Sequence, residues 1–121
     1  MNKIKLLVID DEYHIRLFFF EEFEKEGFDV VTSDGNQDIL KLVDREKPHA
    51  VILDINLEEK HNGLDLLRKI RSKDQKIPVI LCSALQNMRD DLQTIDADWF
   101  VSKSIDITEL KMSVRNLLDM A

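Results

Sequence analysis

The sequence predicts an α/β fold in which a parallel sheet is covered by helices on both faces. Five short apolar runs occur along the chain, and segments with apolar residues at helical spacing separate them. Three of the runs are continuously apolar, as expected for parallel strands that are buried on both sides. Because strand and helix alternate strictly, right-handed crossovers and a doubly wound sheet follow.

The five apolar runs predict the strands. Pro48 and Pro78 come just before the third and fourth runs, where a missing N–H and a fixed φ are best tolerated. The second run is the shortest and is expected at an edge of the sheet. The runs are Leu6–Ile9, Val30–Val31, Ala50–Leu53, Val79–Cys82 and Trp99–Val101. Five strands in a chain of 121 residues favour the flavodoxin-like strand order 2-1-3-4-5.

Five helices are expected to cover this sheet and to complete three layers. Apolar residues three and four apart mark four of them: Ile15, Phe18, Phe19 and Phe23; Ile39, Leu40 and Val43; Leu66, Leu67 and Ile70; and Ile107, Leu110, Val114, Leu117 and Leu118. The remaining helix, around Gln86 to Ile95, has few apolar residues and is expected to be the loosest. Gly27 should end the first helix, and Asp106 with Glu109 resembles a capping box.

Leu17 and Phe20 lie off the apolar stripe of the first helix, three residues apart and therefore close together on its surface. They indicate either packing against the last helix or a docking patch. Packing is the favoured interpretation.

Composition narrows the functional classes. The length fits one domain over residues 1–121, with any output function elsewhere. A net charge of -7 argues against direct nucleic-acid binding, which needs clustered Lys and Arg. Cys82 is alone, which excludes a disulfide framework, and no apolar segment is long enough for a signal peptide or a membrane span. We therefore expect a cytoplasmic protein with no membrane partner.

Polar residues stand at the predicted carboxyl ends of the strands, where ligands bind in this fold. They are Asp10 and Asp11 after the first strand, Asp54 after the third, Ser83 after the fourth and Lys103 in the loop after the fifth. Carboxylates at adjacent strand ends repel one another unless a cation lies among them, and Mg²⁺ is the expected ion because it prefers oxygen ligands. A carboxylate can attack phosphorus, while a hydroxyl and an ammonium group stabilise the transferred oxygens. These residues therefore predict phosphoryl transfer.

With these motifs, the sequence resembles the receiver domain of two-component response regulators from Lys3 to about Leu118. It is similar to single-domain members of the chemotaxis and sporulation-phosphorelay types. The resemblance implies that Asp54 is phosphorylated by a sensor histidine kinase or a histidine phosphotransfer protein. It also implies that Asp10, Asp11, Asp54 and the carbonyl of Asn56 bind Mg²⁺, and that Ser83 and Lys103 are catalytic.

The same resemblance implies a switch and a partner surface. Ser83 and Phe100 match the switch positions, which in similar proteins move after phosphorylation and remodel the face that binds a downstream target protein or output domain. The first helix most resembles that of a sporulation-phosphorelay intermediate. By this likeness, His14, Ile15 and Phe18 would contact the phosphodonor.

Some positions depart from the family pattern. Ser104 follows Lys103 where a cis proline is usual, so the loop either keeps a costly cis bond or changes shape. Glu58 replaces another proline, and Gly63 stands one residue further from Asp54 than usual, which indicates an insertion.

The sequence also suggests three alternatives to a free-standing phosphorylated receiver: a phosphatase, a docking receiver and a fragment of a longer regulator. A magnesium-dependent phosphatase of the haloacid dehalogenase type also uses an Asp nucleophile, but it needs an Asp-x-Asp pair that Asp10-Asp11-Glu12 does not provide. A docking receiver that works without phosphorylation, and a receiver fragment of a longer regulator, remain open. The leading interpretation is a signalling switch that catalyses its own phosphorylation and dephosphorylation, not an enzyme with turnover.

Overall fold

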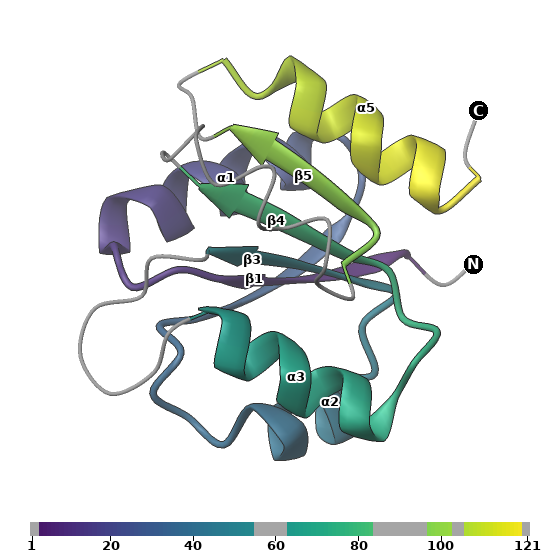
Figure 1. Ribbon diagram of the computed structural model, residues 1–121. Helices are drawn as coiled ribbons and strands as arrows, with labels where there is room; N and C mark the ends of the chain where they lie inside the picture. The colour runs from purple at the N-terminus through teal and green to yellow at the C-terminus, as the bar shows by residue number, and fades with distance from the viewer. Residues whose placement is uncertain (1–2, 55–62, 84–96, 103–105, 120–121) are drawn as a thin grey trace.

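The sheet lies at the centre of the computed structural model, which describes residues 3–54, 63–83, 97–102 and 106–119 (Figure 1). Its five parallel strands have the order β2-β1-β3-β4-β5, so the predicted order is confirmed. The strands are β1 (Lys5–Ile9), β2 (Asp29–Ser33), β3 (Ala50–Asp54), β4 (Val79–Ser83) and β5 (Trp99–Ser102). In this order β1 and β3 are neighbours, so the carboxyl ends of both strands lie at the same edge of the sheet.

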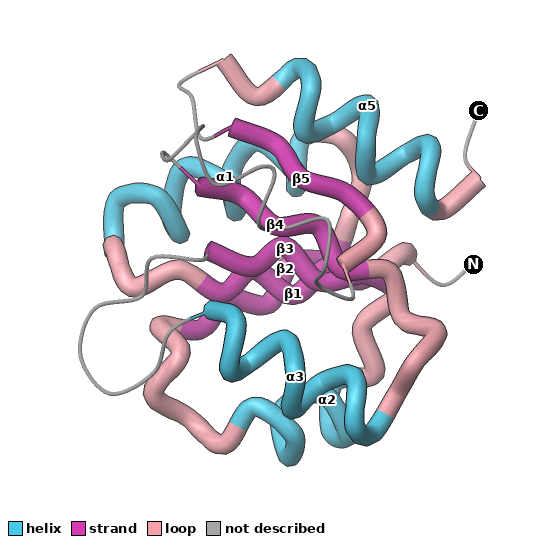
Figure 2. The backbone as a smooth tube through the Cα atoms, in the orientation of Figure 1, coloured by secondary structure: helices cyan, strands magenta, loops and turns pink. Residues whose placement is uncertain are grey.

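Helices cover both faces of the sheet. Figure 2 shows α1 and α5 on one side of the strands and α2 and α3 on the other. The helices are α1 (Tyr13–Lys25), α2 (Ile39–Glu46), α3 (Gly63–Lys73) and α5 (Thr108–Leu117). The predicted helix at Gln86 to Ile95 lies outside the described residues. None of the helices in the described ranges is long and apolar enough to cross a membrane.

The continuously apolar strands contribute side chains to two hydrophobic cores, one on each face of the sheet. Leu7, Ile9 and Val51 belong to the core under α2 and α3. Leu6 and Val8, which alternate with them along β1, belong to the core under α1 and α5. Each β1 residue named here is fully buried, as a two-sided parallel strand requires.

The first helix packs through an aromatic cluster and ends as predicted. Phe19 and Phe23 are buried with ring centroids 6.4 Å apart, and Phe28 lies 5.8 Å from Phe23. Gly27 follows the helix with a φ of 94°, a left-handed conformation that glycine adopts at low cost. The N–H of Phe28 then donates to the carbonyl of Phe23, which closes the turn.

The favoured packing role of Leu17 and Phe20 was wrong. Their exposed fractions are 41% and 36%, and neither belongs to the core shared with α5. Phe19 and Phe23 take that position, since they lie on the face of the helix that points toward the sheet. Leu17 and Phe20 instead line a shallow surface hollow of about 240 Å³ with Tyr13, Arg16 and Thr32.

The start of α5 also differs from the prediction. Asp106 is not the N-cap of a capping box with Glu109; its Oδ1 instead accepts from the hydroxyl and N–H of Thr108 at 2.7 and 3.0 Å. The Thr108 hydroxyl, followed by its N–H, lowers the pKa of the Asp106 carboxyl. The N-cap position is Ile107, whose side chain is buried in the core. Helix α5 therefore begins after a buried apolar residue, without a side-chain hydrogen bond from its N-cap.

A buried arginine connects α3 to the amino ends of β4 and β5. The Nη2 of Arg71 lies 2.6 Å from an Asp98 oxygen, and its Nη1 donates to the carbonyl of Ile77 at 2.6 Å. The same Asp98 oxygen accepts from the N–H of Val79 at 2.8 Å. The exposed fraction of Arg71 is only 7%. This Arg71–Asp98 clamp fixes the edge of the sheet opposite the polar strand ends.

Candidate functional site

The carboxyl ends of the strands meet at one edge of the sheet. In the register of the sheet, Ile9 pairs with Leu53, and Asp54 pairs with Cys82. Asp10 therefore follows β1 beside Asp54 at the end of β3. One position further, Ser83 pairs with Ser102. The predicted convergence of the first, third and fourth strand ends is thus present in the backbone.

Three consecutive acidic residues gather after β1. Carboxylate oxygens of Asp10, Asp11 and Glu12 all lie within 4.8 Å of one another. Asp10 is buried, Asp11 is half-buried and Glu12 is exposed. Glu12 was not among the predicted ligands. Its position directly after the acidic pair was the available signal, but a third consecutive carboxylate also fits a solvated helix start.

Hydrogen bonds hold the N–H, the carbonyl and the side chain of Asp10. Its N–H donates to the carbonyl of Ser33 at 3.0 Å, which extends the pairing of β1 with β2. Its carbonyl accepts from the Nη1 of Arg16 at 2.8 Å. Its Oδ1 accepts from the N–H of Glu12 at 2.9 Å. Backbone and side chain of Asp10 are therefore fixed together, which preorganises the turn between β1 and α1.

Asp54 ends β3 with an exposed fraction of 3%, close to the 2% of Asp10. It is not a member of the three-carboxylate cluster after β1, but it lies at the neighbouring strand end. Two nearly buried carboxylates at adjacent strand ends are costly without compensating positive charge. Carboxylate oxygens are also the ligands that Mg²⁺ prefers. The donor set of this edge therefore fits a magnesium ion.

The structure describes some of the other predicted site residues and leaves others outside the described ranges. Asn56 and Lys103 lie outside the described residues, and Ser83 is described only as the last residue of β4. Phe100 is partly buried against the core under α2 and α3. On α1, His14 is exposed, whereas Ile15 and Phe18 are partly buried against the core under α1 and α5.

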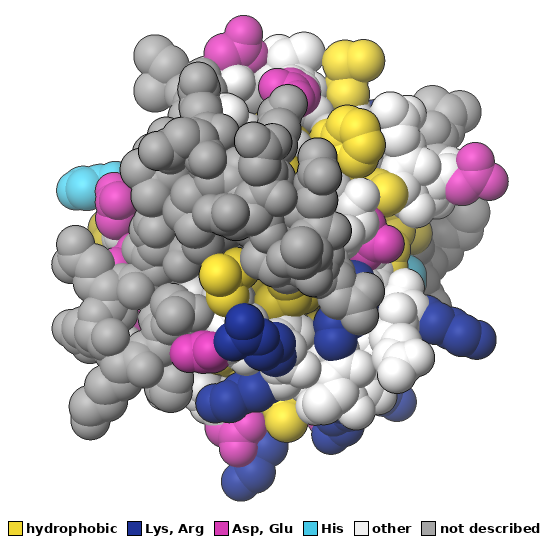
Figure 3. All heavy atoms as spheres, viewed as in Figure 1, with side chains coloured by type: hydrophobic (Ala, Val, Ile, Leu, Met, Phe, Trp, Pro, Cys, Tyr) yellow, Lys and Arg dark blue, Asp and Glu magenta, His cyan; other side chains and the backbone are white. Residues whose placement is uncertain are grey.

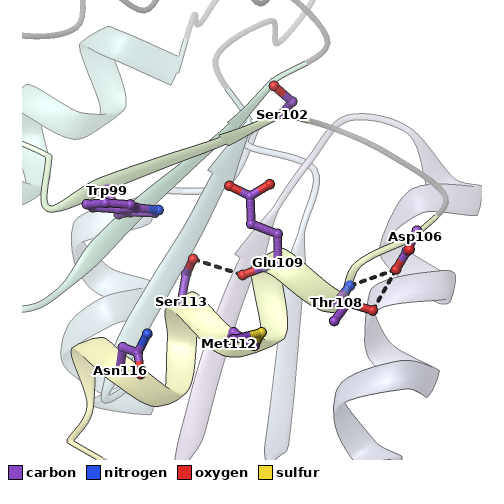
Figure 4. Close-up of a pocket in the computed structure, with 8 residues that line it drawn as sticks. All are labelled: Trp99, Ser102, Asp106, Thr108, Glu109, Met112, Ser113 and Asn116. Atoms are coloured by element: carbon purple, nitrogen blue, oxygen red, sulfur yellow. Dashed lines mark hydrogen bonds between the residues drawn. The ribbon is translucent and has the colours of Figure 1, made fainter.

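A pocket of about 560 Å³ lies between β5 and α5 (Figure 4). We call it the β5–α5 groove; its lining residues are Trp99, Ser102, Asp106, Thr108, Glu109, Met112, Ser113 and Asn116. Trp99 and Met112 are exposed to 54% and 59%, which is high for large apolar side chains. Figure 3 shows hydrophobic side chains exposed over this region and Lys and Arg side chains over α2 and α3.

Comparison with known proteins matches residues 6–115 to the family described as the response regulator receiver domain. The chain belongs to this family. The receiver is 30% identical over 122 residues to sporulation initiation phosphotransferase F of Bacillus subtilis, covering 99% of this chain and 97% of that protein. It is 32% identical to a probable transcriptional regulator ycf27 of Cyanophora paradoxa, covering 98% of this chain and 49% of the relative. It thus spans about half the length of several curated relatives.

Solved receiver structures share the fold. The response regulator TrrA of Thermotoga maritima, in complex with Mg²⁺-BeF, is 35% identical with a TM-score of 0.86, covering 93% of this chain and 97% of that one. TrrA in complex with the histidine kinase ThkA is 35% identical with a TM-score of 0.84, covering 94% and 97%. The predicted family and the flavodoxin-like receiver fold are therefore confirmed.

Proposed function

We propose that this receiver accepts a phosphoryl group on Asp54 from a histidine kinase or histidine phosphotransfer protein, with Mg²⁺ as cofactor and residues 1–121 as one domain. The observation that carries the proposal is the strand register, which brings the buried Asp54 beside the buried Asp10. The complexes of TrrA with Mg²⁺-BeF and with a kinase support the same chemistry in a relative. A cytoplasmic location is part of the proposal.

The transfer step uses the Asp54 carboxylate as nucleophile. One of its oxygens attacks the phosphorus of a phosphohistidine, so that an O–P bond forms while the P–N bond breaks and the imidazole nitrogen leaves with the electron pair. Ser83 would donate a hydrogen bond to one transferred oxygen, and Lys103 would neutralise charge on another. Water that attacks the same phosphorus would break the aspartyl O–P bond, release inorganic phosphate and restore the carboxylate. The domain would thus catalyse its own phosphorylation and dephosphorylation as a switch.

Asp10, Asp11, Asp54 and the Asn56 carbonyl would hold the cofactor. Bound Mg²⁺ supplies positive charge that stabilises the transferring phosphoryl oxygens. The chain contributes a preorganised oxygen ligand, because the hydrogen bonds to Ser33 and Glu12 fix Asp10. Little reorganisation of the turn would therefore accompany metal binding.

The proposed output runs through β5. Ser83 and Phe100 would move together after phosphorylation. Phe100 directly follows Trp99 along β5, and Trp99 lines the β5–α5 groove. Successive strand residues point to opposite faces, so a shift of the β5 backbone at Phe100 would also move Trp99 on the other face. We assign the groove to a downstream target protein or output domain, without direct nucleic-acid binding. On the input side, His14, Ile15 and Phe18 would meet the phosphodonor, and His14 offers the most surface.

The test is phosphorylation by a small-molecule donor. The chain is incubated with acetyl phosphate and Mg²⁺, and its intact mass is compared with that of Asp54→Asn. We expect one added phosphoryl group in the parent and none in Asp54→Asn. Asp29→Asn is the matched control, because Asp29 is an exposed aspartate at the other end of the sheet and should leave the gain intact. Absence of a gain in the parent would favour a docking receiver that works without phosphorylation.

A further inference from the structure

Arg16 makes a contact that the proposed phosphoryl transfer does not use. It lies in the first turn of α1, yet its side chain reaches back to β1, where Nη1 donates to the carbonyl of Asp10 at 2.8 Å. Its guanidinium also lies over the Tyr13 ring, with 5.7 Å between the Cζ atom and the ring centroid. A planar guanidinium can make both contacts at once, by donating in its plane and stacking through its face.

The orientation of the Asp10 carbonyl determines the conformation of the turn between β1 and α1 that carries Asp10, Asp11 and Glu12. The chain leaves the sheet there, and two residues later the N–H of Glu12 donates to the Asp10 side chain. Rotation of the Asp10–Asp11 peptide would break the contact with Arg16 and move the Asp11 carboxylate relative to that of Asp10. The Arg16 contact therefore opposes the motion that would scatter the carboxylate cluster.

We propose that Arg16 is a positioning residue for the magnesium site: by holding the Asp10 carbonyl, it fixes the β1–α1 turn in the conformation that gathers the Asp10 and Asp11 carboxylates. This inference depends on the proposed magnesium site. Arg16 does not bind the ion, so its effect passes through the geometry of the turn. Groups that orient metal ligands from outside the ligand set commonly change metal affinity by about 10- to 100-fold.

The positive charge of Arg16 and its positioning role predict opposite changes in Mg²⁺ affinity when Arg16 is replaced. A cation beside the site repels Mg²⁺, so removal of the guanidinium charge would strengthen binding if electrostatics dominated. Positioning predicts weaker binding. The direction of the change in affinity therefore separates the two effects.

The experiment measures Mg²⁺ binding by isothermal titration calorimetry without any phosphodonor. We expect Arg16→Met to raise the Kd for Mg²⁺ by about tenfold. Arg16→Lys should recover part of the affinity, because an ammonium group can still donate to the Asp10 carbonyl. Arg68→Met is the matched control, since Arg68 forms an exposed pair with Asp65 on α3 and should leave the Kd unchanged.

Hydrogen exchange of the metal-free chain gives a second readout. The Glu12 N–H should exchange faster in Arg16→Met, whereas amides in the core strand β3 should keep their protection. A uniform loss of protection would indicate a general stability role and would contradict the proposal. An unchanged or lowered Kd in Arg16→Met would also overturn it. If the parent itself binds no Mg²⁺, the proposed magnesium site fails along with the role of Arg16.

Discussion

The Arg71–Asp98 clamp gives the sharpest prediction about stability. Asp98→Ala removes the carboxylate next to a guanidinium that is only 7% exposed, and it removes the acceptor of the Val79 N–H. Loss of one partner from a buried ion pair costs about 3–5 kcal/mol. Because the Asp98 side chain is 39% exposed and Arg71 keeps the Ile77 carbonyl, water replaces part of the lost interaction. We therefore expect a loss of about 2–3 kcal/mol.

Urea unfolding followed by far-UV circular dichroism measures this loss as a shift of the midpoint at unchanged slope. Arg68→Ala is the control, because Arg68 is 74% exposed in its pair with Asp65 and such surface pairs contribute less than about 1 kcal/mol. The double variant Arg71→Met/Asp98→Ala should be less destabilised than the sum of its single variants, since neither charge is left behind. A loss below about 0.5 kcal/mol in Asp98→Ala would refute the assignment of the clamp as a buried pair.

Three further predictions concern pH, the switch and the end of α1. Lys111, followed by Lys25, lowers the pKa of the Glu22 carboxyl, so the stabilisation is present above the ordinary pKa of glutamate and is lost as pH falls through the lowered value. The difference in unfolding free energy between the parent and Glu22→Gln should therefore shrink from pH 7 to pH 3 in urea titrations. Trp99, the only tryptophan, should change its emission when beryllofluoride and Mg²⁺ are added, and Asp54→Asn should abolish that change. Gly27→Ala should lower the free energy of unfolding by about 1 kcal/mol. The cause is the positive φ alone, because a Cβ at Gly27 meets no atom within 4 Å. A thermal midpoint equal to that of the parent would contradict this strain.

The strand order was predictable because its determinants are local. A continuously apolar run such as Leu6–Ile9 requires cover on both faces, and alternation with helices then restricts the topology. The placement of Asp10 and Asp54 at adjacent strand ends followed from this topology, because Asp10 directly follows β1 and Asp54 ends β3. The position of a residue at a strand end therefore predicted the edge of the sheet at which it lies.

The failures have a different physical cause. The sequence spacing of Leu17 and Phe20 does not say which neighbour occupies that side of α1, and the structure leaves both exposed. The Arg16 contact with the Asp10 carbonyl could not be predicted either, because every residue has a main-chain carbonyl and the sequence does not indicate which one accepts. The start of α5 also differed from the prediction, because the Asp106 side chain bonds to Thr108 and the N-cap position falls on Ile107. Long-range and main-chain contacts thus set the limit of the sequence prediction.

The core under α1 and α5 joins parts of the chain that are synthesised far apart in time. Phe19 and Phe23 share it with Leu110 and Val114, near the other end of the sequence. A nascent chain emerging from the ribosome must therefore wait until α5 has appeared before it can close this side of the sheet. Until then its aromatic side chains remain exposed to solvent, where chaperones that recognise apolar segments can bind them.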